Sequence, residues 1–201
     1  MTTVGHNARR VGAEVLADML AGYGVTHVFM VPAVLRRTFA EMERRTKIAR
    51  IHCHGEKSAA YMADGYARAS GKPGVCMAQV IGALNLAAGL RDAYLAHSPI
   101  IAMTGGRDPK TKFRKVYQEI DDVPAFEPVT KMNVTIDDVA RIPDMVRQAF
   151  RTATTGAPGP CTCNSAAMRA RSISRKPKWT DSSRRSFRAC RRSVPSRKLP
   201  T

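Results

Sequence analysis

The chain has 201 residues and a formal net charge of +17, and hydrophobic residues make up 44% of it. This length can bury the core of one ordinary domain, and this apolar fraction argues against a wholly disordered chain. No apolar run approaches the ~18 residues that a membrane-spanning helix requires. No apolar stretch follows the basic residues at the start of the sequence, so we expect no secretory signal.

The positive charge is concentrated at one end of the sequence. Residues 161–201 contain 12 basic residues against one acidic residue, a net of +11, whereas residues 1–160 carry only +6. A charge of +17 ordinarily suggests binding to nucleic acid or to an anionic surface, but here an Arg/Ser-rich segment accounts for most of it. We therefore predict a folded domain over residues 1–160 and an unstructured basic tail over residues 161–201.

Helical and strand patterns alternate along the predicted domain. The elements, in chain order, are helix 11–22, strand 26–31, helix 35–45, strand 47–54, helix 56–70, strand 74–81, helix 82–96, strand 99–104, a loop-rich connection 107–128, strand 129–136 and helix 139–155. Repeated strand–helix units with nearly continuous apolar strands predict an α/β fold, with a parallel sheet covered by helices on both faces.

Ligands of such sheets bind at the carboxyl ends of the strands. Three segments of the chain follow predicted strands and are therefore candidate binding points: residues 31–33, 54–56 and 79–85. We find no internal repeat that would suggest a different architecture.

A short histidine and cysteine motif, His52-Cys53-His54, raises the question of a metal site. Alternation along a strand would place both histidines on one face, but no second ligand pair at metal spacing follows nearby. A packed strand end is the favoured interpretation, and no metal site is predicted. Cys53 and Cys76 are expected to be buried thiols in a reducing compartment, which favours a cytoplasmic protein.

Residues 54–106 resemble the N-terminal pyrimidine-binding domain of thiamine diphosphate enzymes, and most closely the acetolactate synthase-like group. The motifs that carry this resemblance occur in order and with family spacing. They are Glu56, the A-D-G-Y-A-R run at 63–68, G-K-P-G at 71–74, the glycine turn with an Asn at 82–85, S-P-I-I-A-M-T-G at 98–105, Gln118-Glu119, and T-T-G-A-P-G-P at 154–160. The resemblance covers roughly residues 10–160.

The resemblance implies a catalytic, cofactor-binding role for Glu56. In this family a glutamate hydrogen-bonds the aminopyrimidine ring of thiamine diphosphate and favours its imino tautomer, whose nitrogen removes the thiazolium proton. Glu56 lies at a predicted strand–helix junction, where such a bond can be screened from water. The alternative is a surface glutamate in a first helical turn, stabilised by the helix dipole.

The resemblance also implies weaker roles for other residues. Gly82 and Asn85 match a family turn near the cofactor, although a helix start that needs a small residue is an equal alternative. Pro32 and Ala33 occupy the place of the family V-P-G segment, with Ala33 in place of glycine. Gln118 resembles a substrate-side glutamine, and an exposed loop residue is its alternative.

The family binds the diphosphate and its Mg²⁺ through a G-D-G…N-N motif in a second domain, and this motif does not occur in the sequence. The family's active site forms between two chains, so the resemblance implies a second chain that supplies the diphosphate-binding domain, and a homo-oligomer for full-length relatives. The substrates would be 2-oxo acids, in carboligation or decarboxylation. The sequence does not decide whether FAD is used. A second enzyme interpretation is the pyrimidine-half subunit of a two-chain 2-oxo acid decarboxylase.

The tail has two open interpretations. Codons for residues 161–165, read one base earlier, must encode apolar residues at the positions of Cys161 and Cys163, which gives the alternation typical of a strand. We therefore hypothesise that residues 161–201 are an out-of-frame product, and that the domain, without its last strand, is truncated, aggregation-prone and inactive alone. The alternative is a nucleic-acid-binding tail, but Trp179 and Phe187 alone interleave its basic residues, so nucleic acid is not the expected partner.

Overall fold

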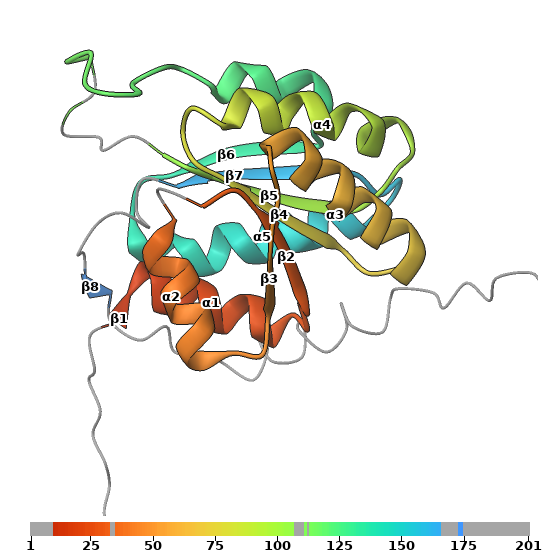
Figure 1. Cartoon of the computed structure of the whole chain (residues 1–201), viewed down its shortest axis with the longest axis horizontal. Coiled ribbons are helices and arrows are strands. Elements are labelled where there is room, and N and C mark those ends of the chain that lie inside the picture. The colour runs from red at the N-terminus through yellow and green to blue at the C-terminus, as the bar shows by residue number, and fades with distance from the viewer. Residues whose placement is uncertain (1–9, 33–34, 107–110, 112, 166–172, 175–201) are drawn as a thin grey trace, which may run out of the picture.

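The computed structural model describes residues 10–32, 35–106, 111, 113–165 and 173–174 (Figure 1). Its helices are α1 (Gly12–Gly22), α2 (Arg36–Arg45), α3 (Glu56–Ser70), α4 (Ala83–Leu95), α5 (Ile142–Thr154) and the 3₁₀ helices η2 (Val123–Val129) and η3 (Val139–Arg141). Its strands are β1 (Arg10–Val11), β2 (His27–Met30), β3 (Ala49–His52), β4 (Gly74–Ala78), β5 (Ile100–Gly105), β6 (Met132–Ile136), β7 (Cys161–Ser165) and β8 (Ile173–Ser174).

Six strands form one sheet in the order β3-β2-β4-β5-β7-β6, and every neighbouring pair in it is parallel. The chain passes from β2 outward to β3 and then returns across β2 to β4, so its direction of travel reverses between β2 and β4. Such a reversal leaves a crevice at the carboxyl ends of the two strands, where ligands of open α/β sheets bind.

Helices cover both faces of the sheet, as the sequence predicted. Helices α1, α2 and α5 pack on one face, and α3, α4 and η2 on the other (Figure 1). The first face is filled by large side chains such as Leu16, Leu20 and Phe150, while the second is rich in alanine. The predicted α/β class and its parallel sheet are therefore confirmed.

Most elements begin or end within a few residues of their predicted bounds, and two of the differences have a clear physical reason. β4 ends at Ala78 rather than at residue 81, because residues 79–82 form the turn into α4, closed by a bond from the Ala83 amide to the Val80 carbonyl (3.1 Å). The end of the predicted loop 107–128 and the first residue of the predicted strand 129–136 form η2, since the fully buried Phe126 anchors this segment in the alanine-rich core, and β6 begins only at Met132.

The boundary predicted at residue 160 requires a correction. Cys161–Ser165 is not part of a tail: it forms β7, which is buried along its whole length between β5 and β6. Strand pairing uses backbone groups, and the small side chains of Cys161 and Cys163 fit the core beneath α5. The domain therefore extends through Ser165, and the strand that we expected to be missing is present.

The rest of the tail lies outside the described residues, apart from β8, which pairs with β1 in a separate antiparallel ribbon. The predicted disorder and the nucleic-acid alternative concern residues outside the described ranges. Within those ranges, no helix combines the length and hydrophobicity needed to cross a membrane.

Candidate functional site

The three candidate segments converge at one edge of the sheet. They follow β3, β2 and β4, which are consecutive neighbours, so their carboxyl ends lie side by side. The end of β2 is tied to β4 by a hydrogen bond from the Val31 amide to the Met77 carbonyl (3.3 Å). The reversal point between β2 and β4 is therefore bordered by the segments predicted to carry the site.

Glu56 is the first residue of α3, and its side chain reaches the start of α4. Its Oε2 accepts a hydrogen bond from Nδ2 of Asn85 at 3.2 Å. Glu56 is half-buried, so its carboxylate is partly open to a ligand. The position also suits a negative charge, because the free amides of a first helical turn carry partial positive charge.

Gly82 forms a wall against the Glu56 carboxylate. A Cβ atom at this buried position would lie only 2.6 Å from Cγ of Glu56 and nearer still to Oε1. Any other residue would therefore push the carboxylate away from the turn. The structure thus brings together Glu56, Gly82 and Asn85, three residues that the sequence selected from two separate motifs.

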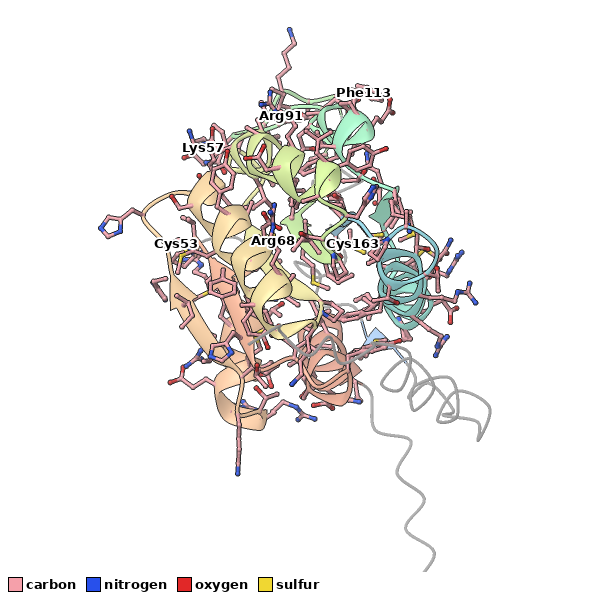
Figure 2. All side chains as sticks on the ribbon, turned by 90° about the vertical axis from the view of Figure 1, so that its right-hand side faces the viewer. Cys53, Lys57, Arg68, Arg91, Phe113 and Cys163 are labelled. Carbon is pink, nitrogen blue, oxygen red and sulfur yellow. The ribbon has the colours of Figure 1, made fainter. Side chains whose placement is uncertain are left out.

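Close packing of α3 against α4 sets this geometry (Figure 2). A Cβ atom at Gly89 would lie 2.7 Å from Cβ of Ala60 and 2.8 Å from the Lys57 carbonyl oxygen. The two helices approach closely where Gly89 meets Ala60, and the buried residues of both helices are mostly small: Ala59, Ala60, Ala63, Ala67, Ala83, Ala87 and Ala93. The first turns of both helices are therefore held at a short separation.

The A-D-G-Y-A-R motif contributes an ion pair to α3. Arg68 donates to both carboxylate oxygens of Asp64, from Nε at 2.9 Å and from Nη2 at 2.6 Å. The two residues lie four apart in the sequence, which places their side chains on one face of the helix. The Asp64 side chain is 8% exposed, so the two charge-assisted bonds compensate a largely buried carboxylate within the helix that presents Glu56.

Gln118 lies in a separate loop. It is half-buried, has a left-handed φ of 62°, and donates from Nε2 to the Tyr117 hydroxyl at 3.1 Å. The loop is shaped by Glu119, whose carboxylate accepts from the amides of Phe113 (2.6 Å) and Val116 (3.0 Å). The structure therefore does not join Gln118 to the Glu56–Asn85 pair.

Pro32 follows β2 and borders a hollow of about 350 Å³ between α2 and β3. Its lining consists of Met30, Pro32, Arg36, Phe39, Ala40, Glu43, Arg50 and His52. Sequence reasoning missed the two arginines, although alternation along the strand places Arg50 and His52 on one face. Ala33 lies outside the described residues.

The His52-Cys53-His54 motif is divided between two environments. Both histidines are exposed, and His52 borders the hollow. Cys53 points to α3, where its Sγ lies 3.5 Å from Sδ of Met62, and burial raises the pKa of its thiol. Within the described ranges, no three His, Cys, Asp or Glu side chains are grouped as metal ligands would be.

Comparison with known proteins assigns a family to this arrangement. The family described as "Thiamine pyrophosphate enzyme, N-terminal TPP binding domain" matches residues 10–125. The chain belongs to this family. The acetolactate synthase-like resemblance is also confirmed by relatives that carry this name and are much longer than the matched region.

A probable acetolactate synthase large subunit of Methanocaldococcus jannaschii is 40% identical over 150 residues, which are 74% of this chain and 25% of that relative. The acetolactate synthase of Bacillus subtilis is 37% identical over 150 residues, 74% of this chain and 26% of its own length. A chloroplastic acetolactate synthase of Arabidopsis thaliana is 37% identical over 153 residues, 75% of this chain and 23% of the relative. The chain therefore spans about a quarter of the length of these relatives.

Proposed function

We propose that this domain binds the aminopyrimidine part of thiamine diphosphate, with the Glu56 carboxylate as the hydrogen-bonding partner of the ring. The observation that carries the proposal is the hydrogen bond from Asn85 to the Glu56 carboxylate, which lies against the backbone of Gly82. It supports a carboxylate that is held in place at the carboxyl edge of the sheet and is still partly open to a ligand.

The residues of the site fit this group. An aminopyrimidine is flat and carries hydrogen-bonding atoms on its edge, so it needs an accessible carboxylate and little side-chain bulk beside it. The side chain that Gly82 lacks would occupy the space now filled by the carboxylate. When bound, thiamine diphosphate supplies the nucleophilic carbon for reactions of 2-oxo acids. Glu56 would hold a proton between one carboxylate oxygen and the ring.

The proposed enzyme is acetolactate synthase-like and acts on 2-oxo acids. The diphosphate and its Mg²⁺ would be bound by a domain from a second chain, which completes the site. Without that anchor for the charged diphosphate, the 201-residue chain would bind the cofactor weakly and would not turn over pyruvate. Support comes from the acetolactate synthase relatives, of which the chain spans about a quarter.

The first test measures the binding of thiamine diphosphate to the full chain by ligand-observed NMR. Replacing Glu56 with Gln removes the ionisable carboxyl group that shares a proton with the ring, so Glu56→Gln should weaken binding by about tenfold or more. Glu127→Gln, at an exposed carboxylate in η2, is the matched control and should bind like the wild type. Equal affinity of the wild type and Glu56→Gln would contradict the proposal.

Gly82→Ala tests the wall independently of the charge. The new Cβ would displace the carboxylate, so binding should weaken to a similar degree. Gly65→Ala is the control, because a Cβ at Gly65 meets nothing within 4 Å. Unchanged binding by Gly82→Ala would mean that the observed position of the carboxylate is irrelevant to the ligand.

The frameshift remains a separate hypothesis, and sequencing of the gene around codon 160 tests it. An uninterrupted homologous reading frame through this point would refute it. If the frame is interrupted, restoring it should give a longer chain whose thiamine diphosphate-dependent turnover of pyruvate can be assayed.

A further inference from the structure

The first turn of α4 contains a residue whose role the proposed function leaves open. We infer that Asn85 is a positioning residue for Glu56: it fixes the orientation of the carboxylate and does not itself contact the cofactor. This inference rests on the proposed function, because Glu56 is taken to be the group that meets the ligand.

The contact between α3 and α4 supports this role. Gly82, Asn85 and Gly89 follow one another at spacings of three and four, so they lie on one stripe of α4 or the turn before it. Glu56 and Ala60 lie four apart on the facing stripe of α3. Gly89 meets Ala60, and one turn earlier Asn85 meets Glu56. The amide of Asn85 is thus directed at α3 by the same close packing.

The two oxygens of Glu56 have different surroundings. Oε2 accepts the hydrogen bond from Asn85, whereas Oε1 is the oxygen that faces the Gly82 wall. An ionised carboxylate has about four lone-pair sites, so one bond from Asn85 leaves acceptor capacity for a ligand. The bond and the wall together restrict a side chain that otherwise rotates freely, which reduces the entropy lost when a ligand orders it.

The chemistry of an amide suits this task. Asn85 donates from an uncharged group, so it orients the carboxylate without neutralising it, as a lysine or arginine would. An aspartate at the same place would have no donor and would set a second negative charge against Glu56. Asn85 itself is exposed, so changes at this position need not disturb the core.

A double-mutant cycle on the full chain separates positioning from direct contact, with thiamine diphosphate as the probe. Asn85→Leu removes the donor at similar size and should weaken binding about three- to tenfold in the wild-type background. In the Glu56→Ala background it should change binding by less than about 1.5-fold, since the group that it positions is gone. An equal loss in both backgrounds would overturn the inference, because Asn85 would then act on the ligand directly.

A second measurement needs no ligand. In protein labelled with ¹³C at glutamate, the Cδ resonance of Glu56 should shift in Asn85→Leu and stay in place in Gln148→Leu, an exposed amide control on α5. An unmoved Glu56 resonance in Asn85→Leu would overturn the inference. If the wild type failed to bind thiamine diphosphate at all, the proposed function would fail, while the resonance would still report whether Asn85 holds Glu56.

Discussion

The two faces of the sheet differ in the size of the side chains buried against them. Under α1, α2 and α5, large side chains predominate in the core, among them Leu16, Met19 and Leu20. Under α3 and α4, alanines predominate and the helices approach each other closely. The first face stabilises the domain by burial of apolar area, whereas the second places the first turns of two helices at a defined separation.

The difference explains where a site can form. Polar side chains as short as those of glutamate and asparagine meet across a helix pair only when the backbones lie close, and Gly89 against Ala60 provides that closeness. On the large-residue face, α1 and α2 are joined instead by the ion pair of Asp18 with the longer side chain of Arg45. Substitutions on the large-residue face are therefore expected to change stability alone, whereas those between α3 and α4 are expected to change stability and binding together.

The four thiols within the described residues are divided between the two faces. Cys161 and Cys163 lie on the large-residue face, and Cys53 and Cys76 on the alanine-rich face. Burial raises the pKa of Cys161 and of Cys163 to about 12, and it also raises that of Cys76, so these groups hold little reactive thiolate at pH 8. Their alkylation should require opening of the sheet and be at least about a thousandfold slower than that of half-buried Cys53. Peptide mapping after timed iodoacetamide exposure measures each rate. Rapid labelling of Cys161 and Cys163 would mean that β7 is not inserted.

Leu20→Ala tests the large-residue face. The fully buried leucine leaves a cavity, so the free energy of unfolding in urea should fall by about 3 kcal/mol. Binding of thiamine diphosphate by the folded fraction should not change, because the site is on the other face. Leu95→Ala, at a leucine that is 69% exposed, should stay within about 0.5 kcal/mol of the wild type. A loss of affinity in folded Leu20→Ala would show that the faces are coupled.

Gly89→Ala tests the alanine-rich face with a single methyl group. The overlap with Ala60 and the Lys57 carbonyl should destabilise the domain by about 1–2 kcal/mol and also weaken binding at the site. Gly65→Ala, in the middle of α3 where a Cβ meets nothing, should instead stabilise by about 0.5–1 kcal/mol. Thermal and urea unfolding of both variants give the comparison. If both substitutions stabilised the domain, the close approach of α3 and α4 would be refuted.

A smaller, pH-dependent effect is expected at the periphery of the large-residue face. Burial disfavours the charge on Asp18, but bonds from Arg45 (2.7 and 3.0 Å) and the charge of Arg10 outweigh it and lower the pKa of Asp18 below its usual 3.8. Its contribution is therefore present above pH 3.8 and is lost as the pH falls through the lower folded value.

Asp18→Asn should cost under about 1 kcal/mol at pH 7, because solvent screens these partly exposed groups. The difference from the wild type should shrink as the pH approaches 3, which urea titrations across this range would detect. Asp137→Asn, at an exposed position, provides the control. A difference that stayed constant with pH would contradict the ion-pair explanation.

Much of the fold could be predicted because apolar patterns report burial directly. The runs around Val28 and Val75 indicated strands fully covered by helices, and the spacing of apolar residues located α1 and α5. Glu56, Gly82 and Asn85 were selected by motif. Glu56 follows β3 and the other two follow β4, the strands on either side of β2, so all three lie at the same edge of the sheet. Sequence patterns did not predict that Asn85 donates to Glu56, because that contact depends on how closely two helices pack.

β7 was missed for a physical reason. Cys-Thr-Cys-Asn-Ser has neither the large β-branched side chains nor the strong hydrophobicity by which strands are recognised, and a basic segment follows it. Its place between two strands supplies backbone partners on both sides, which composition does not reveal. The hollow beside Pro32 was also missed, since it depends on the packing of α2 against β3.

The position of β7 has a consequence for the order in which the domain can assemble. β6 precedes β7 in the chain, yet within this sheet it is joined only to β7 and lies at the outer edge. β6 therefore has no strand to pair with until Cys161–Ser165 has been synthesised and has entered the gap beside β5. A nascent chain that ends before these five residues can pair β2, β3, β4 and β5, but it leaves β6 unpaired. The sheet is complete only when β7, the last of its strands to be synthesised, has entered between β5 and β6.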